Sequence, residues 1–131
     1  MTDHLHMIVG ANEGNKVSDI MRDFKKFTSK EILRVLKADI QESRREWMLN
    51  PFEYASRNDK EITNYRFWQV GKDTQEIFLQ DYFNQKLNYI HQNPVRSEMV
   101  NNPEHYTFSS ATNYADKSSL IDLIFLSLWQ M

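Results

Sequence analysis

A ten-residue stretch, LNYIHQNPVR at positions 87–96, constrains this chain more than any other. Its pattern is that of a helix that reaches Pro94, and Tyr89 and Asn93 stand four residues apart within it. Residues with this spacing lie one above the other on a helix, so the phenol and the carboxamide share a face. Proline disfavours helical geometry in the residue before it. The sequence therefore predicts that this helix ends at Asn93.

The pair has two interpretations. In the first, Tyr89 is an ordinary aromatic on the flank of a helix and Asn93 is a residue of its C-terminal turn. In the second, the phenol and the carboxamide oxygen meet at one phosphate that a metal ion activates, because a phenol can act as a nucleophile and an amide oxygen can bind a cation. A second group of residues near the start of the chain favours the second interpretation.

That group is the pair His4 and His6. The segment HLHMIV at 4–9 ends in apolar, β-branched residues and is followed by a glycine-containing polar stretch, which predicts a strand and then a loop. In a strand, residues i and i+2 point to the same side, so two imidazoles would stand together. A lone histidine pair is often only a surface feature, and a divalent-metal site needs a third ligand. Asn93 is the candidate.

Composition limits the possible classes of protein. The 131 residues are enough for one domain, 1–131, with a modest core. No apolar run approaches the roughly 20 residues that span a bilayer, so no membrane partner is expected. The absence of cysteine excludes disulfides and thiolate metal sites. No basic region followed by an apolar stretch opens the chain, so a cytoplasmic location is expected.

The net charge and the number of turn-forming residues limit the possible folds and partners. The net charge is −2, so a nucleic-acid partner would have to be held by a local patch and not by the field of the whole molecule. Three glycines and three prolines are few for this length. Such scarcity favours long regular elements and argues against an all-β sandwich.

The first long element is a helix predicted from an N-cap at Ser18 to about Lys37. Apolar residues gather on one side of its helical wheel and basic residues on the other. The basic side either contacts phosphates or only keeps the helix soluble, and Asp19 and Asp23 dilute its charge. The candidates for phosphate contacts are Arg22, Lys25, Lys26 and Lys30.

The rest of the chain alternates between further elements. The predicted order is a helix-like segment at 42–48, a polar loop at 56–61, a half-buried aromatic strand at 65–70, a helix at 77–92 and a helical turn at 109–114. Residues 120–126 are apolar and fit a helix or a strand equally well. On the helix at 77–92 a more polar edge runs beside the apolar stripe, and its members are Tyr82, Lys86, Tyr89 and Asn93. An edge of this kind can anchor a side chain and still leave it accessible.

Five segments taken in order resemble one family. They are TDHLHMIV at 2–9, SDIMRDFKKFTSK at 18–30, FWQ at 67–69, YIHQNPVR at 89–96 and YTFSSA at 106–111. Together they resemble the HUH single-tyrosine transposases, in particular the branch related to REP-associated tyrosine transposases. Each segment is weakly specific by itself, and the resemblance depends on all five occurring in the same order over nearly the whole chain.

The resemblance implies a fold and a chemistry. It implies an α+β, ferredoxin-like sheet with packed helices, in which the histidine motif lies on a central strand and binds Mg²⁺ or Mn²⁺. Carried over by motif, His4, His6 and Asn93 would be metal ligands and Tyr89 the nucleophile. The enzyme would cleave and rejoin single-stranded or hairpin DNA through a 5′-phosphotyrosine, within one chain or in a homodimer.

The sequence departs from the family pattern at its N-terminus. Relatives carry a strand, a helix and a further strand before the histidine motif, whereas Met1 here falls where that second strand would end. The chain is therefore expected to lack the N-terminal half of the sheet, as a decayed or mis-started copy of a mobile element would. The alternatives are a catalytically impaired DNA-binding remnant and, far behind it, a histidine-based metal-binding protein unrelated to DNA.

Overall fold

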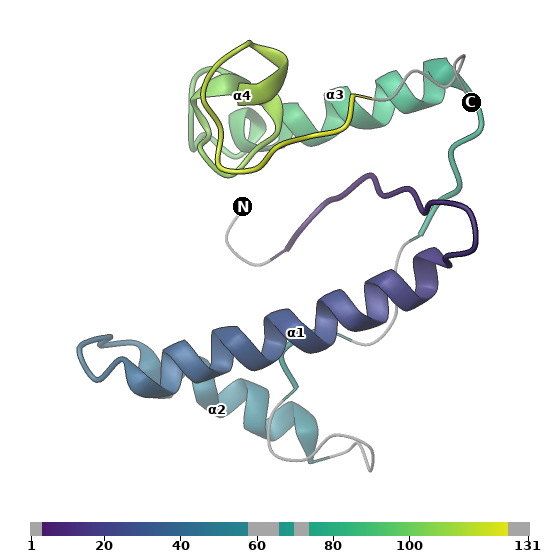
Figure 1. Cartoon of the computed structure of the whole chain (residues 1–131). Coiled ribbons are helices and arrows are strands. Elements are labelled where there is room, and N and C mark those ends of the chain that lie inside the picture. Colours follow the sequence, from purple (N-terminus) through teal and green to yellow (C-terminus); the bar gives the residue numbers. More distant parts are fainter. Residues whose placement is uncertain (1–3, 58–65, 70–73, 126–131) are drawn as a thin grey trace. The chain divides into compact units, whose positions relative to one another are not determined.

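The computed structural model describes residues 4–57, 66–69 and 74–125, and these are largely helical (Figure 1). The elements are α1 (Val17–Ala38), α2 (Arg45–Ser56), α3 (Gln80–Arg96), the short 3-10 helix η1 (Pro103–His105) and α4 (Ala111–Tyr114). The chain divides into two compact units. The first unit holds the described residues 4–8 and 74–125, and the second holds 9–57 and 66–69.

The predicted α+β ferredoxin-like sheet is wrong, because no described residue belongs to a strand. A strand exists only when a second extended segment completes its ladder of hydrogen bonds. The described part of the predicted strand at 65–70, residues 66–69, instead joins the helices of the second unit through its side chains. Residues 4–9, the expected metal-binding strand, have no regular secondary structure. Alternating polarity alone was therefore a poor guide in both segments.

Helix α1 is close to its predicted length, since Val17–Ala38 begins two residues before the prediction and ends one residue after it. The predicted N-cap at Ser18 is wrong: the N-cap is Lys16, and no side chain caps the helix there. Asp19 lies in the first turn and Lys37 in the last, where each charge is favourable to the helix dipole. No α1 residue is fully buried.

The aromatic segment 66–69 docks on both helices of the second unit. The Trp68 indole N–H donates a hydrogen bond to the Thr28 hydroxyl of α1 at 3.1 Å, and the Trp68 ring lies 6.0 Å from that of Phe24. Phe67 packs against Phe52 of α2, with ring centroids 5.1 Å apart. The amide of residue 66 adds a backbone hydrogen bond to the Phe52 carbonyl at 2.7 Å. These contacts use the aromatic residues that suggested a strand.

Helix α2 is longer than predicted and carries Pro51 in its interior. The chain reverses direction between α1 and α2, and Arg45 donates a 3.4 Å hydrogen bond to the carbonyl of Lys37 across this reversal. Two aromatic residues of α2, Trp47 and Tyr54, are exposed, so part of this helix is accessible.

Helix α3 corrects the prediction at its C-terminal end. It does not stop at Asn93 but continues through a buried Pro94 to Arg96. Proline removes only one intrahelical hydrogen bond at this position, and the helix then closes in a Schellman motif. In that motif the Glu98 amide donates to the Val95 carbonyl and the Met99 amide donates to the Pro94 carbonyl, each at 3.0 Å. These two hydrogen bonds thus offset the intrahelical bond that Pro94 cannot donate.

The core of the described residues is small. Phe83 and Ala111 are the buried hydrophobic side chains of the first unit outside proline, and Thr112 is a buried polar one. η1 contacts both α3 and α4. No helix among the residues described is long and apolar enough to cross a membrane.

Some predictions fall on residues outside the described ranges. They are Thr2 and Asp3 of the first motif, residues 58–61 of the predicted loop, the ends of the predicted strand at 65 and 70, and residue 126 of the apolar C-terminal segment. The described part of that segment, 120–125, is neither helix nor strand.

Candidate functional site

Three of the predicted site residues lie together in the first unit. The rings of His4 and His6 meet edge to face with centroids 5.1 Å apart, and His6 meets the ring of Tyr89 in the same manner at 5.7 Å. Tyr89 projects from α3 and is 44% exposed, so its phenol is accessible to a substrate. The histidine segment and the tyrosine helix are thus adjacent although most of the chain separates them.

The electrostatics of this cluster favours a neutral imidazole. Partial burial lowers the pKa of His6, and the nearby His4 lowers it further because two imidazolium charges repel each other. At neutral pH His6 is therefore in the form that can bind a metal ion or accept a hydrogen bond.

The two histidines are close enough to share one divalent ion, provided that the rings turn out of their edge-to-face contact so that a nitrogen of each points at it. A metal-bound imidazole nitrogen lies about 2.1 Å from the ion, and two imidazoles on one ion at a tetrahedral angle have centroids roughly 5 Å apart. The pair matches this spacing at 5.1 Å. Within the described ranges no three His, Cys, Asp or Glu side chains group as a metal site. The remaining ligands would therefore be a carboxamide, solvent or a substrate oxygen. These oxygens suit Mg²⁺ or Mn²⁺, whereas the two imidazoles favour a transition-metal ion over Mg²⁺.

Asn93 follows Tyr89 by one helical turn, and its amide nitrogen is buried without a hydrogen-bond partner. An unmade hydrogen bond of this kind costs about 1–3 kcal/mol. The Nδ2 end of the amide can donate to an anionic oxygen. Rotation of the amide by half a turn would present its oxygen to a cation instead. Because this nitrogen is closed to solvent, Asn93 would serve a phosphate or a metal ion only after its side chain turned outward.

Sequence reasoning missed Arg96, whose guanidinium carbon lies 5.3 Å from the centre of the Tyr89 ring. The signal was the seven-residue spacing, which is close to two helical turns and keeps both residues on one side. The prediction that the helix ends at Asn93 hid this relation. Because α3 continues to Arg96, a cation stands beside the candidate nucleophile.

The four predicted phosphate contacts on α1 belong to the second unit. Arg22 is paired with Asp19 at 2.8 Å and with Asp23 at 2.9 Å, and the hydrogen bond to Asp23 raises its pKa. The Lys25 ammonium lies 6.0 Å from the centre of the Trp68 ring. The two remaining candidates, Lys26 and Lys30, are exposed. Arg22 thus faces carboxylates, which weakens its attraction for a phosphate.

His91 has a structural role on a different side of α3. Its Nε2 and the Ser110 hydroxyl are 2.8 Å apart, and its ring meets that of Tyr114 with centroids at 5.2 Å. Burial lowers the pKa of His91. His91 is two positions after Tyr89, which corresponds to about 200° around a helix. The contacts that fasten residues 110–114 to α3 therefore leave the side that carries Tyr89 open.

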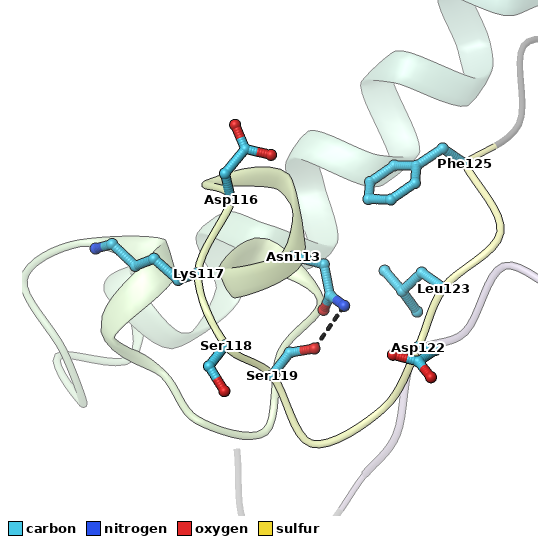
Figure 2. Close-up of a pocket in the computed structure, with 8 residues that line it drawn as sticks. All are labelled: Asn113, Asp116, Lys117, Ser118, Ser119, Asp122, Leu123 and Phe125. Atoms are coloured by element: carbon cyan, nitrogen blue, oxygen red, sulfur yellow. Dashed lines mark hydrogen bonds between the residues drawn. The ribbon is translucent and has the colours of Figure 1, made fainter.

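An open pocket of about 580 Å³ lies in the C-terminal part of the first unit (Figure 2). Asn113 donates hydrogen bonds to the Ser119 hydroxyl at 2.6 Å and to the Ile121 carbonyl at 2.9 Å. These bonds hold the loop after α4 in place, as the dashed line in Figure 2 illustrates for Ser119. None of the predicted site residues lines this pocket.

Comparison with known proteins identifies no relative. Family models, curated proteins and solved structures gave no match to this chain. A functional assignment therefore depends on the residues themselves.

Proposed function

We propose that this chain is a metal-dependent DNA strand transferase that cleaves and rejoins single-stranded DNA through a phosphotyrosine at Tyr89. The observation that carries the proposal is the contact between His6 and Tyr89, with His4 beside His6. These are the residues that the transposase resemblance assigns to metal and nucleophile. The unpartnered amide of Asn93, one turn further along α3, supports the same assignment.

The proposed chemistry is a single displacement at phosphorus. The Tyr89 oxygen forms a bond to the scissile phosphorus, and the bond from phosphorus to the 3′-oxygen breaks. The phenol proton passes to solvent and the leaving 3′-oxygen takes up a proton, which yields a 5′-phosphotyrosine and a free 3′-hydroxyl. Rejoining is the reverse displacement with a 3′-hydroxyl as the nucleophile, so no nucleotide cofactor is consumed.

Each side chain of the site has a different role in the proposed reaction. Tyr89 is accessible, and the edge of the His6 ring limits the directions in which its phenol can point. Asn93 can donate to a non-bridging phosphate oxygen, and Arg96 adds a positive charge beside the ring. His4 and His6 would hold a divalent ion, which when bound offsets the charge that develops on the phosphate.

The test is the formation of a covalent adduct. The full chain is incubated with Mn²⁺ or Mg²⁺ and a pool of randomised hairpin-bearing single strands labelled at the 3′ end, because the tyrosine retains the 3′ fragment. A labelled band that survives denaturing electrophoresis is expected for the natural chain and for Tyr54→Phe, an exposed tyrosine of α2. No band is expected for Tyr89→Phe.

Two outcomes would contradict the proposal. An adduct that persists in Tyr89→Phe would show that another residue is the nucleophile. Binding of the DNA pool with no adduct under either metal ion would instead favour a DNA-binding remnant without cleavage.

A further inference from the structure

Helix α3 carries two contacts between a cation and an aromatic ring. The Lys86 ammonium lies 5.1 Å from the centre of the Tyr82 ring, and the Arg96 guanidinium lies 5.3 Å from the centre of the Tyr89 ring. The two aromatic residues are seven positions apart, so the second pair repeats the first about two helical turns later. A contact of this kind is weak where solvent can reach it, and the cation can turn from the ring to a phosphate oxygen at little cost.

These residues form one continuous stripe, the α3 stripe, which consists of Tyr82, Lys86, Tyr89, Asn93 and Arg96. The spacings of four, three, four and three residues keep all five on one side of the helix over about 21 Å. None of the five side chains is fully buried.

One side of α3 is occupied. Phe83 and Pro94 are buried in the first unit, and His91 is bonded to Ser110. A helical wheel places Phe83, Pro94 and His91 away from the α3 stripe. The stripe borders this occupied side, and together with the exposed Asp81, Gln85 and Asn88 it belongs to the part of the helix that a ligand can reach.

The charge of α3 matches a polyanion. Its sequence contains Lys86 and Arg96 and a single carboxylate, Asp81, which a helical wheel places away from the stripe. On α1, by contrast, Asp19 and Asp23 face Arg22 at hydrogen-bonding distance. The two cations of α3 contact aromatic rings and are thus better placed to receive phosphates than Arg22.

Tyr82 is held in a defined orientation. Its hydroxyl donates a hydrogen bond to the side-chain oxygen of Gln75, and Lys86 approaches its ring. An aromatic ring fixed at its polar end offers a face on which a base can stack, while a neighbouring cation binds the backbone.

We propose that single-stranded DNA binds along the α3 stripe, with a base stacked on Tyr82, a backbone phosphate on Lys86 and the scissile phosphate between Tyr89 and Arg96. This inference rests on the proposed function, because it takes single-stranded DNA as the substrate. It assigns the main DNA contacts to α3 and not to the basic side of α1. Duplex DNA is disfavoured as an occupant, because its bases are stacked in pairs and cannot reach a ring on the surface.

The test measures binding separately from cleavage. Fluorescence anisotropy with a labelled 20-nucleotide oligo-dT, on the Tyr89→Phe background, gives Kd at several salt concentrations. Tyr82→Ala is expected to weaken binding roughly 5- to 150-fold, the equivalent of one stacked base, and Tyr82→Phe is expected to bind nearly as well as the parent. Lys86→Ala is expected to reduce the slope of log Kd against log salt by about 0.7, and Lys86→Arg to restore it.

The matched control is Lys30→Ala, an exposed lysine of α1 that was itself a predicted phosphate contact. It is expected to change Kd less than twofold. Far-UV circular dichroism of each variant verifies that α3 remains folded, and the Phe and Arg variants test the proposal without removing the side-chain bulk.

Several results would overturn the inference. These are unchanged Kd and unchanged salt slope in Tyr82→Ala and Lys86→Ala, a larger loss in Lys30→Ala than in Lys86→Ala, or tighter binding to duplex or to oligo-rU than to oligo-dT. If the natural chain forms the covalent adduct while the α3 stripe variants bind normally, the inference fails and the proposed function stands. If no adduct forms but the stripe variants lose binding, the proposed function fails and the DNA surface stands.

Discussion

The His6 imidazole meets the Tyr89 ring edge to face, with centroids 5.7 Å apart, although His6 precedes α1 and Tyr89 lies in α3. Residues 4–8 therefore belong with the C-terminal part of the chain and not with the helix that directly follows them. A contact so distant in sequence places a potential metal ligand beside a potential nucleophile. It is the relationship on which the proposed chemistry depends.

Metal binding is the first property to test on this cluster. His6→Ala is expected to weaken Mn²⁺ binding about tenfold or more, because loss of a direct ligand should cost at least as much as loss of a residue that only orients one. Isothermal titration calorimetry or the Mn²⁺ electron paramagnetic resonance signal measures the affinity. His105→Ala, an exposed histidine of η1, is the control and should leave it unchanged. Equal affinity in both variants would exclude His6 as a ligand.

The contact between His91 and Ser110 predicts a dependence of stability on pH. Burial lowers the pKa of His91 in the folded chain below its value of 6.5 in the unfolded chain. Between these two values the unfolded chain binds more protons, so the free energy of unfolding rises with pH. The His91 contribution is complete above about pH 6.5 and is lost as the pH falls through the lower, folded pKa.

His91→Gln removes this titration and leaves a side chain that can still reach the Ser110 hydroxyl. Urea unfolding between pH 5 and 8 should therefore show a shallower rise of stability with pH in the variant. His6 has a pKa lowered in the same direction, so the difference between the two proteins isolates the His91 contribution. Identical slopes would show that His91 titrates alike in both states.

The C-terminal turn of α3 offers a stabilising substitution. Glu98 has a φ of 57°, a left-handed conformation that is unfavourable for a side chain with a Cβ. Glu98→Gly should stabilise the fold by about 0.5–1 kcal/mol, since the relieved strain exceeds the entropy cost of glycine. Glu98→Ala keeps the Cβ and should give no comparable gain. Thermal unfolding followed by circular dichroism measures the difference, and a lower melting temperature for the glycine variant would be contrary to this expectation.

The hydrogen bond from Trp68 to Thr28 should stabilise the second unit. Thr28→Val keeps the shape of the side chain but removes the acceptor of the indole N–H, at a cost of about 1 kcal/mol. Ser29→Ala is the matched control, because among the described residues the Ser29 hydroxyl bonds only to the Lys26 carbonyl of its own helix. Denaturant unfolding of the two variants and of Trp68→Phe measures the effect. Additive losses in Thr28→Val and Trp68→Phe would indicate that the two side chains do not interact.

The helices could be predicted from the sequence because the patterns that indicate a helix are local. The apolar periodicity of residues 18–37 located α1 to within two residues at each end, and the pattern at 77–92 located most of α3. The end of α3 was not predictable, because proline only biases the preceding residue against a helix. Here the backbone bonds of Glu98 and Met99 close the helix beyond Pro94.

The sequence by itself determined which residue types are available for chemistry: two histidines spaced by one residue, and a tyrosine and an asparagine one turn apart. It also determined the helices that carry most of them, since hydrogen bonding in a helix joins near neighbours. Only the tertiary structure decided that residues 4–9 and 66–69 form no strand, that His6 meets Tyr89, and that Arg96 stands beside it. Strand pairing and ring contacts between distant segments depend on which segments meet in space, and periodicity within one segment carries no information about its partner.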